Sequence, residues 1–209
     1  MIETLPELVL AWGRGWAVSR RVPDPVDIPG GFRADVGLPG HRVRYVLHTW
    51  DADELASLAR DHSAPGTWIK VSGHLRGALP DPWVIDSAGY LMTAPFTVGT
   101  RKPPAPYETR VTTDGEVVVA TVVDATGATA AYGRLAPAGE YGVVDRVETA
   151  PAHRRRGLGT TVMSALSDQA ARDGLRTGIL LATDDGRRLY GALGWTVRSE
   201  FAAAYVRED

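Results

Sequence analysis

Hydrophobic positions along the 209-residue chain fall into short alternating runs and a few stretches with helical spacing. In the first half, helices are predicted over residues 5–18 and from Asp51 or Asp53 through Ala59. Strands are predicted there over residues 31–37, 42–48, 67–72 and 83–92. In the second half, the pattern predicts strands over residues 107–112, 116–123, 128–135, 141–149, 178–182, 195–198 and 201–206, and helices over residues 158–173 and 187–193. Antiparallel crossings followed by strand, helix and strand indicate an α+β fold.

The tryptophans divide the chain into two parts. Five of the six, Trp12, Trp16, Trp50, Trp68 and Trp83, precede residue 84, and Trp195 follows much later. Residues 99–106, with the sequence G-T-R-K-P-P-A-P, are typical of an extended and exposed connector. We therefore predict a tryptophan-rich first unit over residues 1–98, a linker over 99–106 and a second unit over 107–209.

A basic, glycine-containing turn stands between the strand at 141–149 and the helix that follows it. Residues 147–160 read V-E-T-A-P-A-H-R-R-R-G-L-G-T. Free backbone N–H groups at a helix N-terminus and the helix dipole favour an anion there. The turn lacks the lysine and hydroxyl of a P-loop and the three glycines of a dinucleotide fingerprint. The alternative is an ordinary helix start with solvated arginines.

Composition narrows the function further. The chain has no cysteine, which excludes disulfides, thiolate metal sites and a cysteine nucleophile. Its five histidines show no metal-binding spacing, so no metal is expected. A net charge of −2 argues against nucleic acid as a partner. Because neither a signal peptide nor a long apolar span is seen, we expect a cytoplasmic protein without membrane contact, and the composition suggests a bacterial source.

Two motifs together resemble one family. The segment Arg154-x-x-Gly157-x-Gly159 is similar to the pyrophosphate loop of the GNAT superfamily of acyl-CoA-dependent N-acyltransferases. The segment L-Y-x-x-L-G-W at residues 189–195 is similar to the signature that closes many GNAT domains. The resemblance covers residues 107–206 and implies a GNAT-like fold, with a mixed, mostly antiparallel twisted sheet flanked by helices.

The resemblance also has limits. The two early helices that usually cover the acceptor site in this family are missing from residues 107–135, or the first unit supplies them. The first unit repeats the order strand, helix, strand, but it has three acidic residues at its helix start where a pyrophosphate would be repelled. It is either a degenerate GNAT copy without a CoA site or an unrelated α+β unit.

The resemblance implies acetyl-CoA as co-substrate. Backbone groups at 147–149 would pair with the pantetheine arm, and the turn would wrap the pyrophosphate through its N–H groups. Thr183 stands where the family often has an asparagine that contacts CoA, whereas Asp184 and Asp185 are typical of turn and cap residues. The implied contacts are Val147, Glu148, Thr149, Arg154, Arg155, Arg156, Gly157, Leu158, Gly159, Thr160, Thr183 and Tyr190.

The catalytic residues implied are Tyr190 and Glu148. Tyr190 matches a position where the family often has a tyrosine near the sulfur, although it can also be a core tyrosine. Asp145 and Glu148 are the candidate bases on the strand at 141–149, and alternation places them on opposite faces unless a bulge resets the register. We favour Glu148, with a water relay as the competitor, and we read His153 as a surface residue.

We therefore expect an enzyme, an acetyl-CoA-dependent N-acyltransferase of class EC 2.3.1.-. It would transfer the acetyl group to a primary amine by direct attack in a ternary complex. The alternative is a non-catalytic acyl-CoA-binding regulatory module. The amine is not readable from the sequence, and the protein is expected to be a monomer or homodimer.

Overall fold

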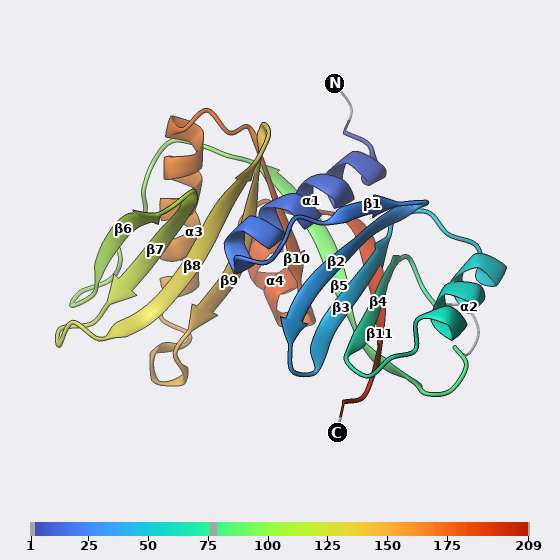
Figure 1. Cartoon of the computed structure of the whole chain (residues 1–209). Coiled ribbons are helices and arrows are strands. Elements are labelled where there is room, and N and C mark those ends of the chain that lie inside the picture. The colour runs from blue at the N-terminus through green and yellow to red at the C-terminus, as the bar shows by residue number, and fades with distance from the viewer. Residues whose placement is uncertain (1–2, 76–78, 209) are drawn as a thin grey trace.

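The computed structural model describes residues 3–75 and 79–208, and within them eleven strands form a single sheet (Figure 1). Four α-helices pack on the sheet in the same described part of the chain. The strands are β1 (Val26–Ile28), β2 (Gly31–Leu38), β3 (His41–Leu47), β4 (Thr67–Ser72), β5 (Trp83–Pro95), β6 (Glu108–Asp114), β7 (Val117–Val123), β8 (Thr129–Ala138), β9 (Tyr141–Thr149), β10 (Thr177–Ala182) and β11 (Thr196–Val206). The helices are α1 (Leu5–Arg20), α2 (Ala52–Asp61), α3 (Leu158–Arg172) and α4 (Asp184–Ala192). The α+β class is confirmed.

The order of the strands joins the two halves of the chain. It runs β1-β2-β3-β4-β11-β5-β10-β9-β8-β7-β6, so the last strand lies between two strands of the first unit. The pairs β3/β4 and β9/β10 are parallel, and each is connected through a helix. The other neighbours are antiparallel. The division into two units stays a prediction, and their strands share one sheet.

The linker lies in no helix or strand and is largely exposed. It is nevertheless held on α3, because backbone N–H groups at its start donate to side chains of that helix. Gly99 donates to Asp168 at 2.8 Å, and Arg101 donates to Ser164 at 2.8 Å. The segment is therefore fixed at one end and is not a free connector.

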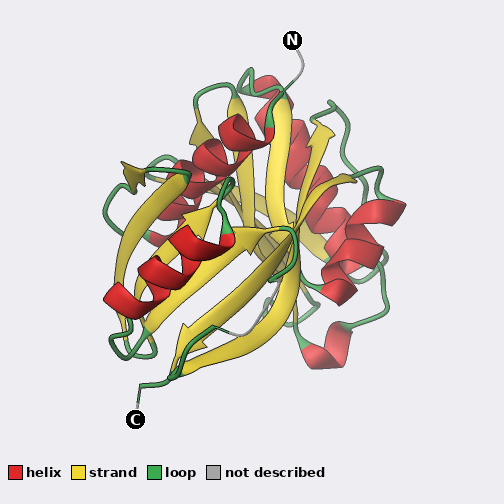
Figure 2. Ribbon diagram, turned by 90° about the vertical axis from the view of Figure 1, so that its right-hand side faces the viewer, coloured by secondary structure: helices red, strands yellow, loops and turns green. Residues whose placement is uncertain are grey.

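Helices cover both faces of the sheet (Figure 2). Side chains of α3 and α4 pack with Val144 and Leu180, whereas α1 packs with the neighbouring residues Val143 and Ile179. Because successive strand residues point to opposite faces, α1 lies on the face opposite α3 and α4. Helix α2 packs on β3 and β4 in a third cluster.

Helix α1 begins with a capping box, in which the Thr4 hydroxyl accepts from the Glu7 N–H and Glu7 accepts from the Thr4 N–H. It extends two residues beyond the predicted range. A Cβ at Gly13 would lie 2.6 Å from the Phe32 ring, and one at Gly15 would collide with Val143. The two glycines therefore let α1 press closely on the sheet.

The structure answers the expectation about the two early helices. Residues 107–135 form β6, β7 and most of β8 without a helix, and α1 of the first unit packs on β8 and β9. No helix in the described residues is long and apolar enough to cross a membrane.

Predicted boundaries also differ from the structure near the C-terminal end of the sheet. The two strands expected at 195–198 and 201–206 are one strand, β11, which continues through register shifts near Val197 and Phe201. Helix α4 begins at Asp184 and not at residue 187, because Thr183 caps it.

Candidate functional site

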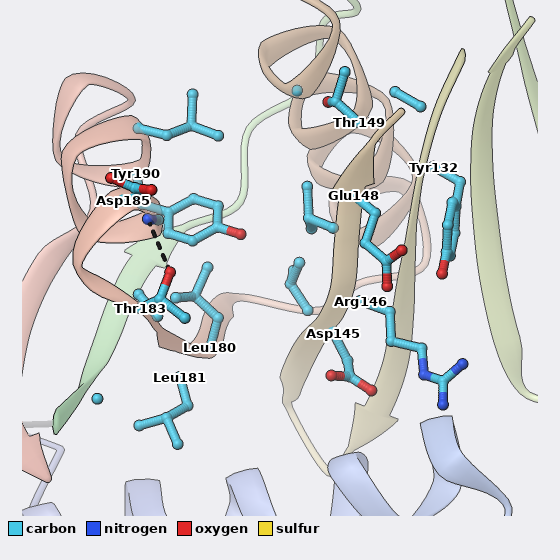
Figure 3. Close-up of a pocket in the computed structure, with 18 of the residues that line it drawn as sticks. Tyr132, Asp145, Arg146, Glu148, Thr149, Leu180, Leu181, Thr183, Asp185 and Tyr190 are labelled. Atoms are coloured by element: carbon cyan, nitrogen blue, oxygen red, sulfur yellow. Dashed lines mark hydrogen bonds between the residues drawn. The ribbon is translucent and has the colours of Figure 1, made fainter. Parts of the chain in front are cut away.

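A cavity of about 1550 Å³ opens where two parallel strands separate. Strands β9 and β10 pair only between residues Tyr141–Val143 and Thr177–Ile179. Beyond this point both strands continue, and residues 144–151 and 180–183 line the cavity between them (Figure 3). The facing edge of β9 therefore presents backbone N–H and C=O groups that no strand pairs with in the described structure.

The basic turn closes one end of the cavity. Arg155 and Gly157 both have left-handed backbone conformations, with φ of 61° and 77°. Gly157 is the N-cap of α3, and no side chain caps that end of the helix. N–H groups at the start of α3 are thus open to an anion, and the alternating backbone forms a concave nest.

Gly159 keeps the mouth between α3 and α4 open. A Cβ at this position would lie 3.2 Å from Leu189 and 3.9 Å from the Thr149 hydroxyl. Both neighbours line the cavity, so a larger side chain would occupy space beside the free edge of β9.

The structure brings eleven of the twelve predicted acetyl-CoA contacts to this cavity. Arg156 does not line it, because its Nη1 donates to the Tyr107 hydroxyl at 2.8 Å. That hydroxyl also lies 2.8 Å from Nδ1 of His153. His153 is therefore not the surface residue that we expected but a partly buried member of a polar cluster outside the cavity.

A bulge in β9 decides where the two candidate bases point. Asp145 pairs with Arg134 of β8, and Glu148 pairs with Tyr132, two residues away on the same strand. Arg146 in the bulge has φ of 51°. Because Arg134 and Tyr132 share one face of β8, Asp145 and Glu148 also share one face, so the bulge that was the stated exception to alternation is present.

The two carboxylates differ in their partners. Asp145 accepts from Nε and Nη2 of Arg20 at 2.5 and 2.8 Å, and from the Ser19 hydroxyl at 2.9 Å. Glu148 forms no ion pair with any described residue. Burial and the nearby Glu148 carboxylate raise the pKa of Tyr132, its partner across the strands. Of the two, Glu148 is the carboxylate that is not already committed to α1.

Tyr190 extends from α4 across the gap toward β9 (Figure 3). Its side chain is buried and tilted against Trp195, and its hydroxyl has no hydrogen-bond partner among the described residues. Burial, with a smaller contribution from Asp145, raises the pKa of Tyr190 to about 12. The phenol therefore keeps its proton at neutral and mildly alkaline pH.

Thr183 is the N-cap of α4, since its hydroxyl accepts from the Gly186 N–H at 3.2 Å (Figure 3). The cap role that we expected for Asp184 and Asp185 is wrong, and both lie in the first helical turn. Asp184 instead accepts from the Tyr90 hydroxyl at 2.9 Å. The Thr183 side chain still lines the cavity.

The sequence analysis missed the side chains that the first unit contributes. The cavity continues past Tyr190 and Asp145 to a wall formed by side chains of the first unit. This wall contains Trp12, Trp16, Arg20, Arg44 and Lys70. The concentration of tryptophans before residue 84 was the available signal. The sequence alone did not indicate which of these side chains line the cavity, because this depends on where α1, β3 and β4 lie relative to β9 in the sheet.

Among the described residues, no group of three or more histidine and acidic side chains is arranged to hold a metal ion.

Comparison with known proteins adds one family match. The model of the acetyltransferase (GNAT) family matches residues 88–195, a stretch that begins within β5 and ahead of the linker. A search of the curated proteins finds no match.

Solved structures share the fold at low sequence identity. A GCN5-related N-acetyltransferase from Kribbella flavida superposes with a TM-score of 0.65 and 16% identity, over 97% of this chain and 96% of that one. A GCN5-related N-acetyltransferase from Sphaerobacter thermophilus gives 0.56 and 13%, over 85% and 77%. A tandem GNAT protein from the clavulanic acid biosynthesis pathway gives 0.52 and 16%, over 74% and 68%.

Proposed function

The chain belongs to the acetyltransferase (GNAT) family, and on that premise we propose that it transfers the acetyl group of acetyl-CoA to a primary amine. The observation that carries this proposal is the continuity of one cavity. It runs from the open N-terminus of α3, along the free edge of β9 and past Tyr190, to the wall that the first unit forms. A donor with a long polar arm and an amine acceptor can therefore meet at Tyr190 from opposite ends.

The residues at the donor end fit acetyl-CoA. The pantetheine arm would pair with the backbone of Val147, Glu148 and Thr149 as an added strand. The pyrophosphate would lie in the nest at Arg155 and Gly157, against the N–H groups of residues 158–160. Each charge-assisted hydrogen bond of this kind contributes about 1.5–3 kcal/mol. Arg154 and Thr183 line the same end and add secondary contacts.

When bound, acetyl-CoA would supply an acyl carbon in a thioester. The amine must first lose a proton, because a lysine-like ammonium has a pKa near 10.4. Glu148 takes this proton, directly or through a water molecule. A C–N bond then forms as the C–S bond breaks, and the Tyr190 hydroxyl gives its proton to the departing sulfur. The nitrogen loses its second proton to solvent, and the proton on Glu148 returns to Tyr190 through solvent, so one proton is released for each acetyl group transferred.

Asp145 has a different task in this scheme. Its carboxylate is held by Arg20 and Ser19 of α1, so it ties the first unit to the strand that carries Glu148. It is a positioning residue for the cavity and not the base.

The test is the release of free thiol from acetyl-CoA across a panel of primary amines. Turnover with at least one amine, together with the N-acetylated product by mass spectrometry, supports the proposal. Binding of acetyl-CoA without turnover on any amine would instead support a non-catalytic acyl-CoA-binding module.

The donor end can be tested without an acceptor. In a calorimetric titration with acetyl-CoA, Gly157→Ala should weaken binding more than Arg154→Ala. The left-handed conformation costs a residue with a Cβ about 1–2 kcal/mol, whereas an exposed arginine contributes less through solvent screening. Equal losses in the two variants would contradict the dominant role of the loop backbone.

A further inference from the structure

The acceptor end of the cavity contains two cations without a matching carboxylate. Arg44 lies on β3 and Lys70 on β4, and both line the cavity beside Trp16 of α1. In the parallel pair of these strands, Arg44 faces Trp68 and Val46 faces Lys70. Arg44 and Lys70 are therefore on one face, two residues apart in register on adjacent strands.

Arg44 is buried, with 8% of its surface exposed. Its guanidinium lies 4.5 Å from the centroid of the Trp16 ring, and its Nε donates to Nε2 of His41 at 3.1 Å. Burial, with the charges of Arg44, Lys70 and Arg20, lowers the pKa of His41 to about 3. The histidine is neutral, so it satisfies a donor of Arg44 without compensating its charge.

Lys70 is in a similar position. Burial and the nearby Arg44 charge lower its pKa to about 8, and Asp86 is the one acid that opposes this shift. Asp86 is two strands away, because Lys70 pairs with Ala203 of β11 and Ala203 pairs with Asp86 of β5. This separation is roughly 10 Å between Cα atoms, and no ion pair joins the two described side chains.

The remaining charges at this end do not neutralise the pair. Arg20 and Asp145 form an ion pair with each other. The wall then has the cations Arg44 and Lys70 against the single carboxylate of Asp86. Buried charges require a partner, and an arginine beside a lysine on an aromatic surface is well suited to a carboxylate.

We infer that the acceptor is an amine of the amino-acid type, whose carboxylate binds between Arg44 and Lys70 while its amino group points toward Glu148 and Tyr190. This inference rests on the proposed function and names the substrate class of the same site. Trp12 and Trp16 are almost fully buried, but both line the cavity, so a hydrophobic side chain of the acceptor can contact the exposed part of their rings.

Matched acceptors test this inference. L-Phenylalanine and L-leucine should each be compared with their own carboxamides, which have the same shape without the negative charge. For at least one pair, the acid should have a kcat/KM at least tenfold above its amide, because hydrogen bonds to charged groups account for roughly 10- to 100-fold. Ethanolamine and phosphoethanolamine form a third pair, and a preference confined to this pair would overturn the carboxylate in favour of a phosphate.

Variants locate the preference. Lys70→Met should reduce the ratio of acid to amide several-fold, and Arg44→Gln should reduce it further if that variant folds. The chain has one other lysine, Lys102 in the exposed linker, and Lys102→Met is the matched control that should keep the ratio. A ratio that is equal in wild type and Lys70→Met would overturn the assignment.

A binding measurement separates the two proposals. The same acids and amides should be titrated into the CoA-loaded protein by calorimetry, whether or not turnover occurs. Tighter binding of an acid, reduced in Lys70→Met and kept in Lys102→Met, supports the inference even if no amine is acetylated. Turnover without any preference for acids over amides, or binding in which no acid binds more tightly than its amide, would overturn the inference. The proposed function would then be decided by the thiol assay alone.

Discussion

The same local topology occurs twice in the sheet, as β3–α2–β4 and as β9–α3–β10. In the first, the parallel strands stay paired over five residues, from Val43 to Leu47. In the second, they pair over three and then separate around the large cavity. The order strand, helix, strand is therefore not sufficient for a proposed donor site. The two units differ in the opening between the parallel strands, which is present between β9 and β10 and absent between β3 and β4 over the paired residues.

The N-termini of α2 and α3 also differ in charge and in capping. Asp51 caps α2 by accepting from the N–H groups of Asp53 and Glu54, whose side chains add two further acids to the first turn. Helix α3 has a glycine, Gly157, as its N-cap, without a capping side chain and without an acid in its first turn. A smaller pocket of about 530 Å³ beside α2 is lined by Tyr45, Trp50 and Leu58, but also by the acids Glu54 and Asp61. An anion is thus expected to bind at the start of α3 and to be repelled at the start of α2.

The largest effect is expected at Tyr190, the cavity residue of the second unit that we propose as the acid. Tyr190→Phe should reduce kcat about 100-fold, as is typical for the loss of a general acid. Because the pKa of Tyr190 is raised to about 12, the wild-type rate should increase as the amine is deprotonated and hold its plateau through alkaline pH. An identical pH–rate profile for enzyme and variant would exclude the acid role.

A smaller effect should follow when the second helix start is made to resemble the first. Gly157→Asp places a carboxylate at α3, and Gly157→Asn is its matched neutral control, since both residues tolerate the left-handed conformation. We expect the aspartate to weaken acetyl-CoA binding about tenfold more than the asparagine, through repulsion of the pyrophosphate. The measurement is a calorimetric titration, and equal affinities would mean that charge at this N-terminus does not select the donor.

Removing the acidic cap of α2 should lower the stability of the protein without changing its affinity for acetyl-CoA. Asp51→Ala removes the cap of α2 and should lower the free energy of unfolding by about 1 kcal/mol, as measured by urea denaturation. Acetyl-CoA affinity should stay the same, because α2 lies outside the donor cavity. A parallel loss of affinity would show that the two units are coupled more tightly than the contacts indicate.

A further expected effect is a pH dependence of stability at Lys70, the first unit's contribution to the second unit's cavity. Its pKa is about 8 in the folded protein, below the ordinary value of 10.5. Between these values the unfolded chain binds more protons, so the lysine disfavours folding less as the pH rises. The groups that act on it are Arg44 and His41 of β3, Trp68 of β4 and Asp86 of β5, while Arg20 and Trp16 of α1 lie around Arg44 and His41.

Urea unfolding of wild type and Lys70→Met at about pH 7.5 and pH 9.5 measures this change. The wild type should gain about 1–2 kcal/mol of stability relative to the variant as the pH is raised, because most of the difference in bound protons lies in this interval. A relative loss over the same interval would mean that Lys70 is stabilised in its charged form.

Local signals account for what the sequence predicted well. The α3 helix, the turn at Gly157 and the strands of residues 107–182 are encoded by nearby residues, through periodicity and glycine positions. Gly157 was expected to lie at an anion-binding helix start, and it is the uncapped N-terminus of α3. The cap at Thr183 was missed because neighbouring aspartates were equally good candidates.

Long-range pairing accounts for what was missed. The bulge at Arg146 places Asp145 and Glu148 on one face, and no pattern in β9 alone announces it. Arg44 and Lys70 reach the cavity because β11 joins β4 to β5, a pairing between segments far apart in the sequence. Strand order of this kind depends on the whole sheet, so the sequence could suggest residues for the proposed donor end but not the residues of the wall that the first unit forms.

The position of β11 also has a consequence for how the chain acquires its structure during synthesis. The strand pairs Phe201 with Ser72 and forms the join between β4 and β5. The loop closed by this pairing spans about 130 residues, and contacts of such large sequence separation form slowly. Until β11 has been synthesised, β4 and β5 each lack this neighbour and expose a strand edge. The nascent sheet is therefore open along its middle until β11 joins its two parts.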